Sequence, residues 1–181
     1  MATRRETQRR PSPATLPGSR PDTSSAHEPA ESAHAATLRK VRTLVEAGRL
    51  QDAFDLANRG AADALLKNAR GVCLLRMQRP EQAVRVYREL TLTGGGIVIR
   101  SNVPLIFKLN FATALLMSGN VGGCCEILHE IRNEDHPRIT QLRAAIENWK
   151  SGLTLFQRLM WRLGNPPEIP ATIDFVPGDF E

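Results

Sequence analysis

Three groups of side chains in this sequence have the chemical types that catalysis or metal binding requires. Cys124 and Cys125 are adjacent, as in a vicinal redox pair. His129 and His136 flank a set of acids, and imidazole with carboxylate is a ligand set for divalent metals. The glycine run 94–96 offers backbone amides of the kind that bind phosphate. The acids between the histidines are Glu130, Glu134 and Asp135.

None of these groups has the context that its chemistry needs. No Lys-Ser/Thr pair follows the glycine run, which we interpret as a flexible loop between helices. His129 and His136 are seven residues apart across an expected turn, which favours solvated side chains. Three cysteines without CxxC spacing argue against a zinc site or a disulfide framework. We therefore predict that the protein is not an enzyme and has no catalytic residues, metal or cofactor.

Charge is unevenly distributed along the chain. The net charge of +5 divides into +1 for residues 1–33, +8 for residues 34–164 and −4 for residues 165–181. A basic middle permits nucleic acid, but its Lys and Arg residues are scattered and Tyr87 is the only tyrosine. We keep a nucleic-acid-associated or regulatory accessory factor, acting through the basic domain and the N-terminal arm, as the alternative function.

Hydropathy and cysteine usage indicate a compartment. No run of about 18 apolar residues is present, so no membrane span is expected. No apolar stretch of the secretory kind lies near Met1. Together with the few unpaired cysteines, this predicts a reducing, cytoplasmic location.

Composition divides the chain into three parts. Residues 1–33 are rich in Arg, Pro and Ser, with five prolines and few apolar side chains, and are predicted to be a disordered arm. Residues 34–164 have helical periodicity. "NPPEIP" stops this pattern, so residues 165–181 are predicted to be an acidic, extended tail.

Apolar residues in the middle part recur at spacings of three and four, beginning with Leu38, Val41 and Val45. Asp63 is expected to cap a helix, and Pro80 fits the first turn of the next. Asn102 is expected to cap a further helix with Pro104 in its first turn. The pattern predicts paired helices in three repeats with capping helices after them: 34–63, 64–93, 103–132 and 137–163.

The stretch "GVCLLRMQRPEQAVRVYREL" shows the internal repeat most clearly. Gly71, Ala83 and Tyr87 give a small–small–large spacing along a helical pair. We interpret this as a packing device, in which small residues let two helices approach and Tyr87 fills the gap towards the next repeat. Cys124 falls at a small position of the third repeat, which favours a buried, inert thiol. The aligned sets are Val41, Ala53 and Ala57 in the first repeat and Ala112, Cys124 and Leu128 in the third.

These residues resemble the tetratricopeptide repeat (TPR), a helix-turn-helix unit of about 34 residues. The resemblance implies an all-α, right-handed α-solenoid of about three TPR-like helical hairpins with a C-terminal capping helix. It also implies that the first helix of each hairpin lines a concave groove. Some TPR proteins clamp a terminal carboxylate with Lys and Asn. Only Asn68 and Asn110 resemble that set here, so we do not expect such a clamp.

The predicted groove indicates a protein–protein interaction adaptor or assembly scaffold. Its expected partner is another protein, bound as a helix or an extended peptide, rather than a small-molecule substrate. The predicted partner-binding residues are Arg42, Asn68, Val72, Leu75, Arg76, Leu109, Thr113 and Leu116.

A second possibility is that the chain fills its own groove or associates with itself. The segment "LTLFQRLMWRLG" presents an apolar side that could pack there, with the acidic tail along basic residues. Trp149 and Trp161 are interpreted as packing anchors. The two possibilities are left open at this point. The apolar side comprises Leu155, Phe156, Leu159, Met160 and Leu163.

Overall fold

The structure, a computed structural model, describes residues 28–60, 62–94, 98–132 and 134–180, with side chains from Ala33 onwards. This part of the chain is helical apart from its loops and one isolated bridge between Leu92 and Ile99. The all-α prediction is therefore confirmed. The helices are α1 (Glu28–Glu46), α2 (Leu50–Arg59), α3 (Ala64–Arg76), α4 (Pro80–Thr91), α5 (Leu105–Met117), α6 (Val121–Glu130), α7 (Pro137–Ser151) and α8 (Leu155–Arg162).

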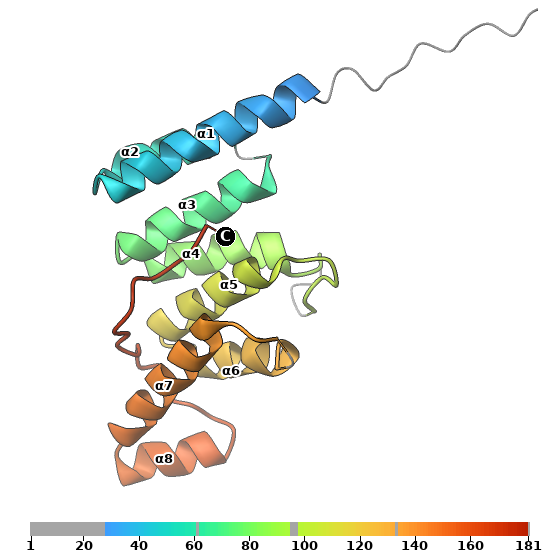
Figure 1. The fold of residues 1–181 in the computed structure, drawn as a ribbon. Helices are drawn as coiled ribbons and strands as arrows, with labels where there is room; N and C mark the ends of the chain where they lie inside the picture. The colour runs from blue at the N-terminus through green and yellow to red at the C-terminus, as the bar shows by residue number, and fades with distance from the viewer. Residues whose placement is uncertain (1–27, 61, 95–97, 133, 181) are drawn as a thin grey trace, which may run out of the picture.

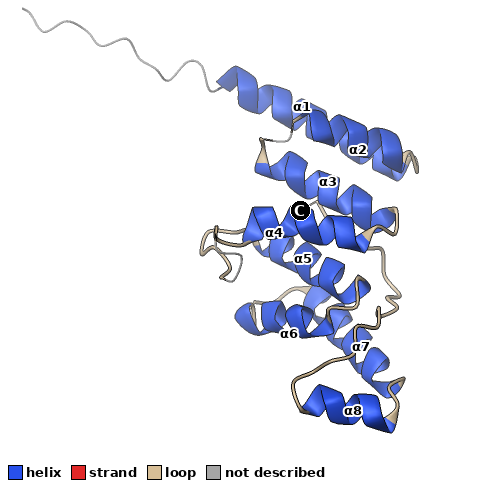
Figure 2. Ribbon diagram, turned by 180° about the vertical axis from the view of Figure 1, so that it is seen from behind, coloured by secondary structure: helices blue, strands red, loops and turns tan. Residues whose placement is uncertain are grey.

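From α1 to α6, each helix packs against the next one along the chain. The odd-numbered helices also contact one another in order, α1 with α3, α3 with α5 and α5 with α7. Figures 1 and 2 show the helices succeeding one another down the molecule from α1 to α8. The consequence is a layer formed by α1, α3, α5 and α7, on which a further segment can lie.

Three turns that join successive helices share one geometry. In each, a residue with positive φ follows the first helix, and the next residue donates its N–H to a carbonyl five positions earlier. The positive-φ residues are Gly48, Gln78 and Gly119, which are 30 and 41 positions apart, the same offsets that align the predicted repeats. The hydrogen bonds join Arg49 to Leu44, Arg79 to Leu74 and Asn120 to Leu115, at 2.8, 2.9 and 2.9 Å.

Two of the three predicted helix starts are confirmed. The Asp63 side chain accepts a hydrogen bond from the Leu66 N–H at 2.9 Å, and Pro80 occupies the first turn of α4. The cap expected at Asn102 is wrong, because Pro104 itself is the N-cap residue and makes no side-chain cap hydrogen bond. The proline ring fixes φ, here −54°, while ψ of 142° remains extended, so helical geometry begins only at Leu105.

The first helix begins earlier than its periodicity suggests. Its backbone is helical from Glu28, so residues 28–33, predicted to belong to the disordered arm, are part of α1. Pro29 lies in the first helical turn, where a missing N–H leaves no hydrogen bond unmade. The rest of the predicted arm, residues 1–27, lies outside the described residues.

The positions predicted to be small are all buried. Val41, Ala53, Ala83, Ala112 and Cys124 have no exposed surface. The space that Gly71 leaves is filled by the Tyr87 ring of the second helix in the pair. A Cβ built on Gly71 would lie 2.4 Å from Tyr87 Cζ.

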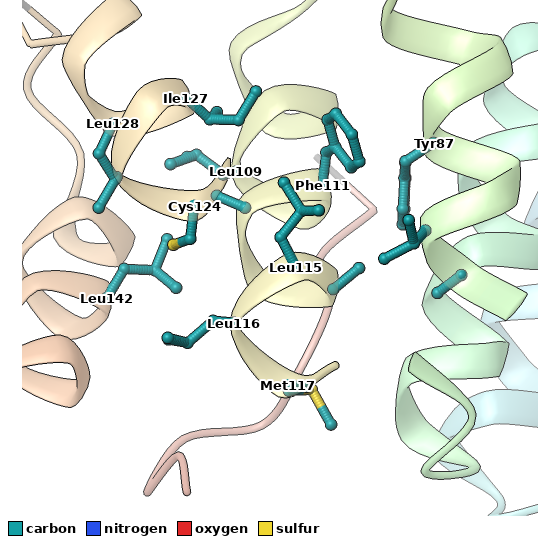
Figure 3. Close-up of a cluster of buried hydrophobic side chains, with 14 of the residues drawn as sticks. Tyr87, Leu109, Phe111, Leu115, Leu116, Met117, Cys124, Ile127, Leu128 and Leu142 are labelled. Atoms are coloured by element: carbon teal, nitrogen blue, oxygen red, sulfur yellow. The ribbon is translucent and has the colours of Figure 1, made fainter. Parts of the chain in front are cut away.

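The large ring also makes the predicted contact with the following helix. The ring centroids of Tyr87 and Phe111 are 6.5 Å apart. Figure 3 shows the two rings facing each other between α4 and α5. Tyr87 therefore links its own hairpin to the next one, as its position in the repeat predicts.

Helix α7 covers the last apolar surface, whereas α8 does not. Leu142 of α7 is completely buried and points towards Cys124 and Leu128 of α6 (Figure 3). Trp149 and Trp161 meet edge to face at 5.4 Å, in agreement with the packing role predicted for them. No residue of α8 is buried, so α7 alone covers the apolar side of the last hairpin.

Candidate functional site

The chain returns across its own helices after α8 (Figure 1). We call residues 165–180 the tail. It first contacts α7 and α5: the Trp149 Nε1–H donates to the Ile169 carbonyl at 2.9 Å, and the Ala171 N–H donates to the Leu116 carbonyl at 3.2 Å. The predicted absence of helix in this segment is confirmed for the described residues. The tail then reaches α3 and α1, and so crosses the whole odd-helix layer.

The tail meets a set of residues on the odd-numbered helices, which we call the tail-binding face. It is built from the inward sides of α1, α3, α5 and the start of α7. Its residues are Arg42, Asn68, Val72, Arg76, Asn110, Leu116 and Arg138.

Two buried asparagines hold the backbone of Asp179. Asn110 is bidentate: its Nδ2 donates to the Asp179 carbonyl at 2.7 Å, and its Oδ1 accepts from the Asp179 N–H at 2.9 Å. Asn68 Nδ2 donates to the same carbonyl at 3.3 Å. Both amides are 1% exposed, so these bonds satisfy polar groups that water cannot reach. Every residue except proline has both groups, so these bonds to the backbone do not depend on the side chain that is bound.

Tyr87 sets the orientation of these amides. Its hydroxyl donates to Asn68 Oδ1 at 3.2 Å, and Asn110 Nδ2 donates to the same oxygen at 2.9 Å. Asn68 Nδ2 is thereby directed at the tail. Burial raises the pKa of Tyr87 well above its ordinary value, so the hydroxyl stays protonated and remains a donor. The space left by Gly71 thus serves the site, because it admits the ring that carries this hydroxyl.

Arginines recognise both the backbone and the side chain of the tail. Arg76 donates to the carbonyls of Pro177 and Gly178 at 3.3 and 3.1 Å. Arg138 donates through Nε, at 3.1 Å, and through Nη2 to one carboxylate oxygen of Asp179. The Arg138 side chain is only 10% exposed, so this charge-assisted contact is shielded from solvent on one side.

Shape and cation–π contacts complete the site. Gly178 has φ of +78°, and a Cβ there would lie 3.2 Å from the Val72 Cα, so only glycine fits without strain. The guanidinium carbons of Arg42 and Arg76 lie 5.4 and 5.8 Å from the centroid of the Phe180 ring. The Phe180 ring also packs against the apolar cluster between α1, α2 and α3.

Most of the predicted partner-binding residues lie on this face. Arg42, Asn68, Val72 and Arg76 contact the tail through their side chains, and Leu116 contacts it through its carbonyl. Leu75, Leu109 and Thr113 are completely buried and belong to the core beneath it. Along helices with apolar residues on several sides, periodicity alone does not separate the core side from the tail-binding side.

Sequence reasoning missed two important residues. Arg138 was not selected at all, and nothing in its local sequence separates it from the other scattered arginines. Asn110 was set aside with the terminal-carboxylate clamp. A signal for it exists: it is the single amide in the apolar helix "LIFKLNFATALLM", where a buried amide requires partners. The asparagines do act together, but on a backbone unit within the tail.

The segment considered as a possible filler of the groove lies away from it. Leu155, Phe156 and Leu163 of the α8 region are 85%, 70% and 69% exposed. Of the two parts of the possibility left open above, this segment does not pack into the groove, whereas the acidic tail does lie along a basic residue at Asp179. α7 ends at Gly152, and the capping box at Thr154 and Gln157 starts α8 as a separate helix.

The cysteines that the sequence offers for catalysis are buried or half-buried, and His136 serves as a helix cap. Burial raises the pKa of the Cys73 thiol to about 11 and that of Cys124 still further, and Cys125 is also shifted upward. His136 caps α7 by accepting from the Arg138 N–H at 3.1 Å. Within the described ranges, no group of three or more His, Cys, Asp or Glu residues is placed to hold a metal ion.

These features define an all-helical chain whose layer of odd-numbered helices holds an extended segment. Comparisons with protein-family models, curated proteins and solved structures give no significant match. The TPR resemblance therefore stays a prediction. Of the helices that the structure describes, none combines the length and apolar character that crossing a bilayer requires.

Proposed function

We propose that this chain is a non-catalytic protein–protein interaction adaptor or assembly scaffold that binds an extended partner segment on the tail-binding face. The observation that carries the proposal is the bidentate contact of Asn110 with the Asp179 N–H and carbonyl, supported by Asn68. Pairing of this kind holds an extended chain through its backbone, which is a recurring way to recognise peptides.

The repeated turns support the finer architecture that we propose, an α-solenoid of three TPR-like hairpins. In such an arrangement, the first helices of successive hairpins present a continuous surface. The tail lies on the corresponding helices α3 and α5, and reaches α1 and α7 at its two ends. The face already contacts its own chain at points from Ala171 to Phe180, which is the length of a short partner segment.

The test uses the full chain with a weakened tail and a labelled peptide added in trans. Replacing Gly178→Ala and Phe180→Ala strains the backbone and removes the ring contact, and we call this double variant the opened chain. The peptide corresponds to residues 173–180, with an amidated C-terminus. Fluorescence anisotropy should show saturable binding to the opened chain.

A matched pair of charge variants locates the binding. Arg76→Ala in the opened chain removes the donors to two tail carbonyls, so we expect about tenfold weaker binding. Arg79→Ala removes the same charge from an exposed position at the far end of the turn, and should leave affinity unchanged. Equal effects of the two variants, or no binding to a folded opened chain, would contradict the proposal.

Leu75→Glu and Leu116→Glu, at two of the predicted partner-binding residues, are unsuitable as probes of the groove. Both leucines are completely buried, so a carboxylate at either position would be desolvated in the core. Such variants would report on folding rather than on binding.

A further inference from the structure

We propose that the partner segment carries an aspartate followed by an aromatic residue, and that residues 177–180 of the tail are a built-in competitor for it. This inference rests on the proposed function and specifies its partner. The tail shows which groups the face recognises, because three successive tail residues each make a different kind of contact. Gly178 lies close to the backbone of α3, Asp179 pairs with one arginine, and the Phe180 ring lies near two arginines.

The aspartate position is selective because of Arg138. Its side chain is 10% exposed and directs two donors at one carboxylate oxygen of Asp179. A peptide with asparagine at this position keeps the size and the backbone contacts but leaves a largely buried guanidinium without its counter-charge. Contacts to charged groups of this kind change affinity by about 10- to 100-fold.

The next position favours a ring. Arg42 from α1 and Arg76 from α3 both place their guanidinium groups within 6 Å of the Phe180 centroid. A leucine keeps the apolar contact with the cluster beneath but has no π face for the two cations. We therefore expect leucine to weaken binding by about 3- to 10-fold, which is less than the loss at the aspartate.

Release of the tail is favoured by its division into two anchors. The first anchor, at Ile169 and Ala171, is joined to Trp149 and Leu116. The second, Pro177–Phe180, makes all the contacts with α1 and α3. Between them, Thr172, Asp174 and Val176 are exposed, whereas Ile173 and Phe175 are half-buried against the core and the Arg138 guanidinium carbon lies 4.5 Å from the Phe175 ring centroid. The second anchor can thus leave while the first remains attached, but its release also separates Phe175 from Arg138.

A tethered competitor raises the partner concentration that binding requires. A segment joined by a short linker has an effective concentration of about 1 mM at its own site. A partner therefore binds only if it matches the Asp–aromatic pattern closely or is itself held nearby. The tail thus sets a minimum affinity for binding, which extended segments of random sequence do not reach.

The experiment compares three full-length chains and three amidated peptides of residues 173–180. The chains are the natural sequence, the opened chain and Val176→Ala, a control on the tail at a side chain that is 62% exposed. The peptides carry the natural sequence, Asp179→Asn or Phe180→Leu. We expect the natural peptide to bind the opened chain at least tenfold more tightly than the natural chain or Val176→Ala.

The outcomes separate this inference from the proposed function. Binding to the opened chain with equal affinity for all three peptides would overturn the Asp–aromatic specificity and leave the adaptor function standing. Equal affinity of the natural and opened chains would overturn the competitor role. No binding to an opened chain of native helical content would overturn both. If the opened chain aggregates, full-length Asp179→Asn, which keeps the size of the tail, replaces it with the same expected order.

Discussion

At the scale of single residues, a series of contacts connects the packing of the core to the binding of the tail. Gly71 leaves space for the Tyr87 ring, the Tyr87 hydroxyl orients Asn68, and Asn68 with Asn110 holds Asp179. A change in the core at Gly71 is therefore expected to act on the tail as well as on stability.

Gly71→Ala should destabilise the chain by about 1 kcal/mol or more. The new Cβ would lie 2.4 Å from Tyr87 Cζ, and overpacking of this kind costs about 1–3 kcal/mol, partly offset by the better helix propensity of alanine. Urea unfolding measures the difference. Gly122→Ala is the control, because it is also helical but its Cβ would lie 3.4 Å from the nearest atom, Pro166 Cγ. Equal destabilisation by both would contradict the packing role of Gly71.

The cysteines should be poorly reactive in the folded protein. Burial raises the thiol pKa of Cys73 to about 11 and also raises those of Cys124 and Cys125, so little thiolate exists at pH 8. A thiol-specific reagent should label half-buried Cys125 slowly and the other two only on unfolding. Rapid native labelling of both Cys124 and Cys125 would revive the redox-pair interpretation.

The raised pKa of Cys73 also predicts that the folded protein loses stability at alkaline pH. Because the folded-state pKa of Cys73 lies above its ordinary value of 9.0, its contribution to stability is complete below pH 9. It is lost as the pH rises from about 9 towards 11, where the unfolded chain ionises first.

At the scale of elements, capping decides where α3 begins, and α3 carries Asn68, Val72 and Arg76. Asp63→Ala should cost about 1 kcal/mol, because it removes the acceptor for the Leu66 N–H at 2.9 Å. Asp63→Asn keeps an acceptor and should retain most of the stability. Thermal unfolding followed by circular dichroism distinguishes the two. If alanine and asparagine lowered the midpoint equally, the carboxylate would act mainly by charge, for example towards His34 at 3.5 Å.

At the scale of the molecule, the tail fastens the first hairpin to the rest. The apolar cluster of α1, α2 and α3 is joined to the larger core only through partly buried side chains such as Phe54 and Met77, and Phe180 of the tail packs against it. Phe180→Ala should therefore raise deuterium uptake in α1 and α2 while leaving α6 and α7 protected. Its expected cost is about 1–2 kcal/mol, since the ring is only partly buried. Val176→Ala should change neither region.

The site was only partly predictable. Asn68, Val72 and Arg76 were found because helical spacing places them on one side of α3. Arg138 was not found, because it joins the site through α7 and only the packing of α7 against α5 brings it to Asp179. The α8 region could not be placed for a similar reason: its apolar residues match a groove in composition, but α8 starts as a separate helix after Gly152 and leaves them exposed.

The sequence by itself determined the helices, their pairing and the repeat offsets, because these depend on the periodicity of apolar side chains and on local turn and cap chemistry. Only the tertiary structure decided what covers the odd-helix layer. That depends on hydrogen bonds and ion pairs between residues up to 111 positions apart, such as Asn68 with Asp179. No local pattern encodes such contacts, because they form only after the helices have stacked and placed their polar side chains together.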